Sequence, residues 1–182
     1  MTIPGGSGKM LFDDIRLERS TPAAANLLIN GGFEDGVLDP WYLIDNTGGG
    51  ATAEVVADDP AEGNSCMHVV VPTVGANFWD VYVTQPGLAF QAGKSYTLSA
   101  WFKCKEGTLD VNIKPEHAAD PWEGYNERVI TITDQWVEYS VTTPVFTADT
   151  SPVSATFHIG FAPGEFCMDN VRFYEGDYTP PE

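Results

Sequence analysis

The sequence predicts an all-β protein, an antiparallel two-sheet β-sandwich of jelly-roll type. Its 182 residues include 18 glycines and 13 prolines, and 12% of the residues are aromatic. This composition is typical of short strands separated by turns, whereas disordered chains are poor in aromatic residues. Roughly ten short segments show strand-like patterns, and no segment shows a convincing amphipathic helix. Together these observations favour a sandwich of antiparallel sheets.

The clearest strand lies between Gly93 and Lys105. Apolar and polar residues alternate there, so that Leu98 and Phe102 share one face. Trp101 falls on the other, polar face, where the core does not need a large indole. Because an aromatic ring on a solvated sheet face suits the apolar face of a sugar ring, Trp101 is the leading candidate for a glycan-binding residue.

The other elements are predicted in order along the chain. A short apolar strand begins near Asn26 and stops at Asn30-Gly31-Gly32, and a turn from Asp39 to Tyr42 presents two aromatic residues. Further strands are predicted at residues 51–57, 66–71, 78–85, 109–114, 129–133, 136–142, 153–161 and 166–174. Between Pro115 and Asn126 all periodicity is lost. A structureless loop of about a dozen residues is uncommon and usually functional.

The chain consists of one large domain with short flanking segments. Residues 11–17 match residues 167–173 type for type, which indicates either the last strand of a preceding module or chance similarity of two short strands. The predicted divisions are 1–19, a strand of a preceding module or an N-terminal extension strand; 20–25, a linker; 26–176, the β-sandwich domain; and 177–182, a C-terminal linker.

The charge of the chain excludes two classes of partner. The formal net charge is −17, from 26 acidic and 9 basic residues. Such a balance repels phosphate backbones and anionic lipids, so neither nucleic acid nor a membrane is an expected partner. No apolar run is long enough to span a bilayer, and residues 1–8 do not resemble a signal peptide, an absence that is also consistent with a fragment.

Three cysteines leave two interpretations open. Cys66 and Cys167 fall in strands that we expect to lie near one another. They form either one disulfide, with Cys104 free, or part of a set of three small thiols in or near the core.

The polar faces of several strands supply a candidate glycan site. Aromatic faces stack on sugar C–H surfaces, and amide and hydroxyl groups orient the sugar through hydrogen bonds. The strand residues expected to converge are Tyr82, Trp101 and Asn112, with Thr156 and His158 on a fourth strand. The residues expected to wall the groove from loops are Trp79, Trp122 and Tyr125. The alternative for any one of these rings is that it fills a gap between sheet and loop.

Enzymatic interpretations have less support. Glycoside cleavage needs two carboxylates that flank one bond, and the candidates are Asp110, Glu116, Glu123 and Glu127. An acidic protein always contains such clusters. The sequence has neither a His-Glu-x-x-His motif nor a Gly-x-Ser-x-Gly elbow nor a Gly-rich phosphate loop. We therefore predict a protein that is not an enzyme.

An ordered set of short motifs resembles a known family. These motifs are Asn30-Gly31-Gly32-Phe33-Glu34, Gly63-Asn64-Ser65, the Gly93 to Ser99 strand, Trp136 with Tyr139, and Met168-Asp169-Asn170-Val171. Over about residues 26–175 the chain is similar to the family 4, 9 and 22 carbohydrate-binding modules, which have a galactose-binding-like β-sandwich. The resemblance implies a jelly roll, a structural calcium ion, and a concave face that binds β-glycan chains.

The resemblance also implies where calcium would bind. Calcium takes six to eight hard oxygen ligands from carboxylates and carbonyls. By resemblance these fall on the Gly32 carbonyl, the Glu34 carboxylate, the Asn64 carbonyl and Asp169. An ion that bridges Glu34 and Asp169 would close a loop almost as long as the domain. The alternative is that both carboxylates only accept backbone hydrogen bonds in turns.

The predicted function is non-catalytic binding of a β-linked polysaccharide, a β-glucan or a xylan, in an aromatic-lined cleft. The module would belong to a secreted, multimodular enzyme of bacterial type and would hold an attached catalytic domain near its substrate. The alternatives are a structural or adhesion module of a cell-surface protein and, with less support, a glycan hydrolase or lyase.

Overall fold

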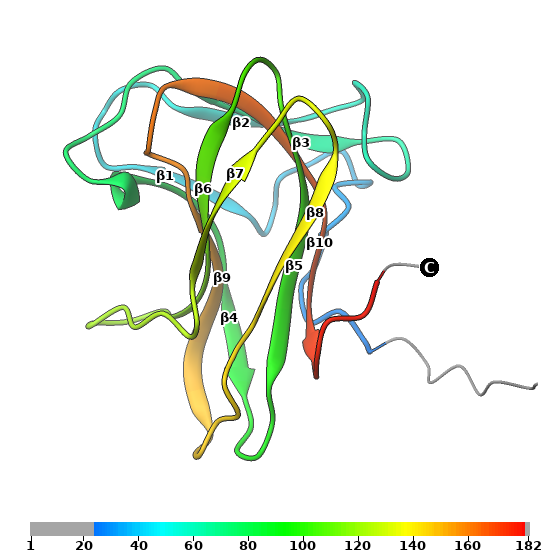
Figure 1. Cartoon of the computed structure of the whole chain (residues 1–182), viewed down its shortest axis with the longest axis vertical. Helices are drawn as coiled ribbons and strands as arrows, with labels where there is room; N and C mark the ends of the chain where they lie inside the picture. Colours follow the sequence, from blue (N-terminus) through cyan, green and yellow to red (C-terminus); the bar gives the residue numbers. More distant parts are fainter. Residues whose placement is uncertain (1–23, 181–182) are drawn as a thin grey trace, which may run out of the picture.

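The structure is a computed structural model that describes residues 24–180 (Figure 1). The predicted N-terminal strand, residues 1–19, and most of the 20–25 linker lie outside the described residues. The elements are β1 (Tyr42–Asp45), β2 (Thr52–Val56), β3 (Cys66–Val71), a single 3-10 turn η1 (Phe78–Asp80), β4 (Val81–Phe90), β5 (Tyr96–Cys104), β6 (Leu109–His117), β7 (Arg128–Ile132), β8 (Val137–Thr142), β9 (Thr150–His158) and β10 (Gly164–Glu175).

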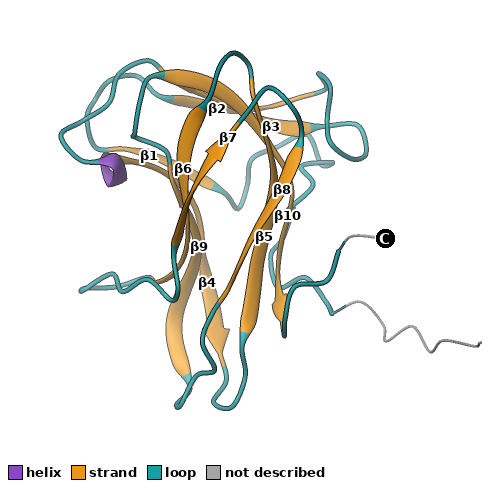
Figure 2. Ribbon diagram, in the orientation of Figure 1, coloured by secondary structure: helices purple, strands orange, loops and turns teal. Residues whose placement is uncertain are grey.

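The strands form two five-stranded sheets that pack face to face (Figure 2). Sheet A has the order β1-β4-β9-β6-β7, and sheet B has the order β2-β3-β10-β5-β8. Every neighbouring pair is antiparallel. The predicted all-β, antiparallel two-sheet sandwich is thus confirmed. Among residues 24–180 no helix has the length and apolar character that crossing a membrane requires.

The core lies between the two sheets. Inward residues of β5, including Leu98 and Phe102, are fully buried, as their alternation predicts. Phe102 meets Phe157 of β9 edge to face, with 5.7 Å between ring centroids, and so joins sheet B to sheet A. Burial of such side chains stabilises the sandwich by about 25 cal/mol per Å² of apolar surface. Where a strand alternates regularly, the residues between its inward side chains face away from the core.

The segment before β1 differs from its prediction. The stretch from Asn26 to Ile29 is not a strand. The segment is held on β10 by the side chain of Asn26 and by one backbone bond: Asn26 Nδ2 donates to the Val171 carbonyl at 3.0 Å, Phe173 N donates to Asn26 Oδ1 at 2.8 Å, and Leu27 N donates to the Phe173 carbonyl at 2.7 Å. Gly31 follows so close to β10 that an added Cβ would lie 2.1 Å from the Val171 oxygen. This close approach explains the glycine at that position.

The predicted turn from Asp39 to Tyr42 is followed immediately by a strand that the sequence pattern did not reveal. Tyr42 begins β1, and its side chain is exposed. Trp41 is buried in the core, where its Nε1 donates to the Asn30 carbonyl at 3.1 Å. Only one of these two aromatic residues is therefore presented to solvent.

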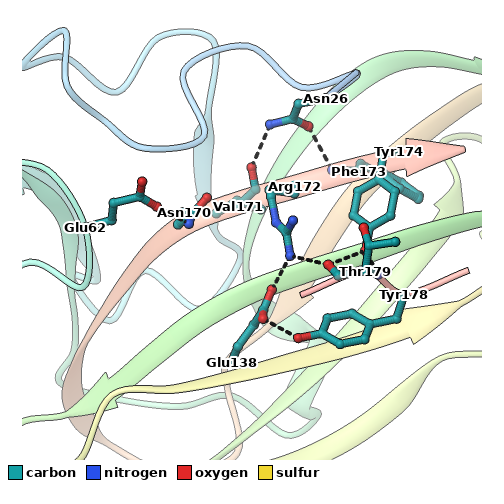
Figure 3. A network of polar contacts seen from close by, with 10 residues as sticks. All are labelled: Asn26, Glu62, Glu138, Asn170, Val171, Arg172, Phe173, Tyr174, Tyr178 and Thr179. Carbon is teal, nitrogen blue, oxygen red and sulfur yellow. Dashed lines mark hydrogen bonds and ion pairs between the residues drawn. The ribbon is translucent and has the colours of Figure 1, made fainter. Parts of the chain in front are cut away.

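Residues at the C-terminal end are attached to sheet B (Figure 3). Arg172 Nη2 on β10 pairs with Glu138 Oε1 on β8 at 2.7 Å and donates to the Thr179 carbonyl at 3.0 Å. Tyr178 OH donates to the other oxygen of Glu138 at 2.6 Å, and this hydrogen bond raises the pKa of Tyr178 to about 12. Within the predicted linker 177–182, Tyr178 and Thr179 are therefore held by side-chain contacts.

All three cysteines are free thiols. Cys66 on β3 and Cys167 on β10 lie on paired strands, as predicted, and the nearby Cys167 thiol raises the pKa of Cys66, with burial acting in the same direction. Cys104 lies on β5, where burial raises its pKa. The structure thus corresponds to the interpretation with three thiols and no disulfide among the described residues.

Candidate functional site

A cleft of about 520 Å³ opens on the outer face of sheet A. Its floor consists of outward side chains from three adjacent strands, Tyr82 of β4, His158 of β9 and Lys114 of β6. The sides come from η1 and from the loop between β6 and β7, which both project from the same side of the sandwich in Figure 1. The lining residues are Asn46, Phe78, Trp79, Tyr82, Lys114, Glu116, Pro121, Trp122, Glu127 and His158.

Two exposed tryptophans lie at the sides of this cleft. Trp79 is 49% exposed and Trp122 is 53% exposed. Trp79 packs edge to face on Phe78 at 4.8 Å, and Phe78 is stacked on Phe161 at 4.6 Å. Trp79 belongs to η1, directly before β4, and Trp122 belongs to the loop after β6, so the two indoles come from segments attached to strands on either side of β9. This arrangement offers two apolar side chains to a ligand in the cleft.

The floor is polar and holds a neutral histidine. His158 is 6% exposed, and burial lowers its pKa to about 4, with the nearby Lys114 ammonium acting in the same direction and Glu127 opposing it. Asn112 Nδ2 lies 2.7 Å from Glu127 Oε2 and 3.3 Å from His158 Nδ1. The Nδ1 atom is then the acceptor, and the proton of the neutral ring is on Nε2. A neutral ring of this kind can donate a hydrogen bond to a ligand hydroxyl.

Tyr82 completes the polar floor. Its ring meets His158 edge to face at 5.9 Å, and burial, with a smaller contribution from Glu116, raises the pKa of its hydroxyl. The phenol therefore stays protonated at neutral pH and is both a donor and an acceptor.

An ion pair lies at the end of the floor nearest the loop. Lys114 Nζ is 2.7 Å from Glu116 Oε1, and both side chains are largely buried. With Glu127, the lining contains two carboxylates against one ammonium. This balance, on a protein of net charge −17, disfavours polyanionic ligands and favours neutral ones.

Four predicted glycan-site residues line the cleft, and the other three do not. Tyr82, His158, Trp79 and Trp122 line it together. Asn112 is 1% exposed and lies beneath the floor, where it supports His158 and Glu127. Thr156, the further residue considered beside these, is also buried, with its Oγ1 3.0 Å from that of Thr84.

The predicted placement of Trp101 in this site is wrong. Trp101 lies on β5, which pairs with β10 and β8 in sheet B, whereas the cleft is on sheet A. Alternation correctly places its side chain on an outer face, but alternation within one strand carries no information about which sheet contains that strand. Trp101 is thus on the opposite side of the sandwich from Tyr82.

Tyr125 is also outside the cleft. Its ring packs edge to face on Phe146 at 4.9 Å, and its hydroxyl lies 3.3 Å from Nδ1 of His117. It anchors the base of the loop and does not contribute a wall.

Several lining residues were not predicted as binding residues. Asn46 follows β1, a strand that was not predicted. Lys114 and Glu116 share the outward face of β6 with Asn112. Their spacing of two residues from one another and from Asn112 could have predicted that they lie on the same face. Glu116 and Glu127 were considered only as catalytic candidates, and the structure engages them with Lys114 and Asn112 respectively.

Three of the four predicted calcium residues line a second, smaller pocket of about 260 Å³. Gly32, Glu34 and Asp169 line it together with Glu62. The Glu34 carboxylate accepts hydrogen bonds from the backbone N–H groups of Asn64 at 2.9 Å and Ser65 at 3.1 Å, so Asn64 supports Glu34 and does not itself line the pocket.

Asp169 is a fully buried carboxylate in this pocket. It accepts backbone hydrogen bonds from Ala61 at 2.9 Å, Glu62 at 3.0 Å and Asn170 at 2.6 Å. Burial raises its pKa to about 6, and the charge of Glu34 acts in the same direction. Within residues 24–180 no group of three or more His, Cys, Asp or Glu side chains has an arrangement suited to a metal ion. The carboxylates of Glu34, Glu62 and Asp169 nevertheless supply the kind of oxygen ligand that calcium takes.

Comparisons with known proteins agree with the fold and identify a family. The chain matches the carbohydrate binding domain family over residues 25–163. It is 27% identical over 170 residues to a cellulose 1,4-beta-cellobiosidase of Acetivibrio thermocellus; the match covers 86% of this chain and 18% of that enzyme. The chain therefore spans about a fifth of the length of this relative.

Solved structures show the same fold. A CBM4 structure superposes with a TM-score of 0.64 at 20% identity, and the match covers 81% of this chain and 99% of that one. The CBM22-1 xylan-binding domain of Xyn10C from Paenibacillus barcinonensis superposes with a TM-score of 0.64 at 15% identity, covering 88% of this chain and 100% of that one. The family model matches most of this chain. The chain therefore belongs to the carbohydrate binding domain family and is a non-catalytic module of the family 4, 9 and 22 type.

Proposed function

We propose that the protein binds a neutral β-linked polysaccharide, a β-glucan or a xylan, in the cleft on sheet A. The observation that carries this proposal is the pair of half-exposed tryptophans, Trp79 and Trp122, on either side of a polar floor. Sugar rings have apolar C–H faces and hydroxyl edges, so a chain that stacks on the indoles can hydrogen-bond to Tyr82 and His158. The excess of carboxylates over ammonium in the lining supports a neutral ligand.

We further propose that the module is secreted and holds an attached catalytic domain at its polysaccharide. The cellobiosidase relative, of which the matched region is 18%, supports this larger context. The module would raise the local concentration of the catalytic domain on the substrate without taking part in the chemistry.

Calcium is the proposed structural cofactor. Glu34, Asp169 and the Gly32 carbonyl would hold the ion, with Asn64 positioning the Glu34 carboxylate. A bound calcium ion supplies a divalent charge that neutralises both carboxylates. Because Glu34 precedes β1 and Asp169 lies on β10, the site would join the N-terminal segment to sheet B and stabilise the folded state.

Affinity electrophoresis tests the proposed function. Wild type is run through gels that contain cellulose derivatives, mixed-linkage glucan, xylan or laminarin, beside a Trp79→Ala/Trp122→Ala variant. We expect at least one neutral β-glycan to retard the wild type and not the variant. Absence of retardation by every neutral β-glycan, with a folded protein, would contradict the proposal and favour a structural or adhesion module.

A further inference from the structure

Lys114 is the one positively charged side chain in the cleft lining, and its contacts are unusual for a ligand-binding lysine. Its side chain is 12% exposed, and it lies on the outward face of β6 beside Thr156 of β9. Two of its three N–H donors are engaged by the protein, one with Glu116 Oε1 at 2.7 Å and one with the Trp122 carbonyl at 2.9 Å. The second contact joins the floor of the cleft to the loop that bears the exposed tryptophan.

The loop between β6 and β7 is otherwise fixed at its base. His117 N donates to the Glu123 carbonyl and Tyr125 N donates to the Pro115 carbonyl, each at 2.8 Å. Trp122 lies at the outer part of the loop, with a positive φ of 60° and a half-exposed side chain. Such a backbone conformation is strained for a large residue and needs support from its surroundings. Within the loop the Trp122 amide donates to the Ala119 carbonyl at 2.7 Å, and the Lys114 hydrogen bond to the Trp122 carbonyl adds support from the floor.

The loop backbone also runs close along the lysine side chain. A Cβ added at Gly124 would lie 2.9 Å from Lys114 Cε and 3.0 Å from Glu127 Oε1. Glycine at this position therefore lets the loop pass close to the Lys114 and Glu127 side chains. The ion pair with Glu116 fixes the ammonium from the other side. A largely buried ion pair adds little to stability, and one established use of such a pair is to specify a single arrangement.

We propose that Lys114 is the positioning residue of the binding site: together with Glu116, it holds the Trp122 backbone so that the indole forms the β6-side wall of the cleft. This inference rests on the proposed function for its effect on binding, and it concerns no contact between Lys114 and the sugar. Lys114 would affect ligand binding only through the position of the Trp122 side chain.

Hydrogen exchange tests the positioning without any ligand. The variant Lys114→Met/Glu116→Gln removes the Lys114 ammonium and the Glu116 charge together. Both are replaced because Lys114→Met alone would leave the buried Glu116 carboxylate unpaired, which would destabilise the protein by itself. The control is Lys105→Met, an exposed lysine outside this cleft. We expect amide exchange in residues 117–126 to rise by about tenfold in the first variant, as a lost charge-assisted hydrogen bond implies, and to stay unchanged in the control.

Gly124→Ala provides a second, independent perturbation. The added methyl group would displace the Lys114 side chain or the loop. We expect the same rise in exchange of residues 117–126 while the rest of the sandwich keeps its protection. Unchanged exchange of this loop in the folded Lys114→Met/Glu116→Gln variant would overturn the proposal.

A double-mutant cycle on the dissociation constant tests the consequence for binding. With the glycan that retards the wild type, Lys114→Met/Glu116→Gln should weaken binding by about tenfold in the wild-type background and by less than about twofold in the Trp122→Ala background. Equal losses in both backgrounds would mean that Lys114 or Glu116 acts directly on the sugar and would overturn the proposal. If no glycan binds the wild type, the proposed function fails, and hydrogen exchange still decides the positioning.

Discussion

Replacing one cleft tryptophan at a time gives the sharpest quantitative prediction. A tryptophan side chain presents about 250 Å² when fully accessible, so the 53% exposure of Trp122 corresponds to roughly 130 Å². A sugar ring stacked on one face would cover about half of this area. At about 25 cal/mol per Å², its loss costs about 1.5 kcal/mol, or roughly tenfold in Kd. Trp79, at 49% exposure, should behave in the same way.

Isothermal titration calorimetry with a soluble oligosaccharide of the bound glycan measures this effect. Trp79→Ala and Trp122→Ala should each raise Kd by about tenfold while the protein stays folded, because neither side chain belongs to the core between the sheets. Trp101→Ala is the matched control on sheet B and should leave Kd unchanged. A change of less than twofold for both cleft variants, or a tenfold loss for Trp101→Ala, would refute the reasoning.

Three further predictions concern stability. Calcium should raise the melting temperature by roughly 5–10 °C at a hundredfold excess over its Kd, and Asp169→Asn should abolish this rise. The same melting temperature in calcium and in chelator would contradict the proposed ion. The pKa of His158 is about 4 in the folded protein and 6.5 ordinarily, so between pH 6.5 and pH 4 the imidazole is protonated in the unfolded chain but neutral in the folded one. Relative to His158→Gln, the free energy of unfolding should therefore fall by roughly 2–3 kcal/mol from pH 7 to pH 4.5 in urea melts, whereas a constant difference would disprove the buried neutral ring. Gly31→Ala should destabilise the fold by about 2 kcal/mol or more in the same assay, because its Cβ would meet the Val171 carbonyl, and wild-type stability would show that the segment moves away freely.

Most of the fold was predictable because strand alternation is a local property. The β5 pattern placed Leu98 inward and Trp101 outward, as observed. β1 was missed because four residues after a turn, Tyr42 to Asp45, carry little pattern. The apolar residues after Asn26 predict a strand, but this segment bonds to β10 mainly through the Asn26 side-chain amide, with a backbone bond from Leu27 N.

The cleft was only partly predictable because it depends on strand order. Tyr82 and His158 come together because β4 and β9 are neighbours, a pairing between residues far apart in the sequence. The same non-local pairing puts Trp101 beside β10, on the other sheet. The role of Lys114 depends on a hydrogen bond to a loop carbonyl, and no residue type at position 122 signals such a contact.

The most direct test of the central claim is an NMR titration of backbone amides with the oligosaccharide that the gel panel selects. We expect chemical-shift changes to concentrate in η1, β4, β6, β9 and residues 117–127, around Trp79, Tyr82, Trp122 and His158. The amides of β5 and β8 near Trp101 should stay unchanged. Shifts concentrated on sheet B around Trp101, with none on the outer face of sheet A, would contradict the cleft as the binding site.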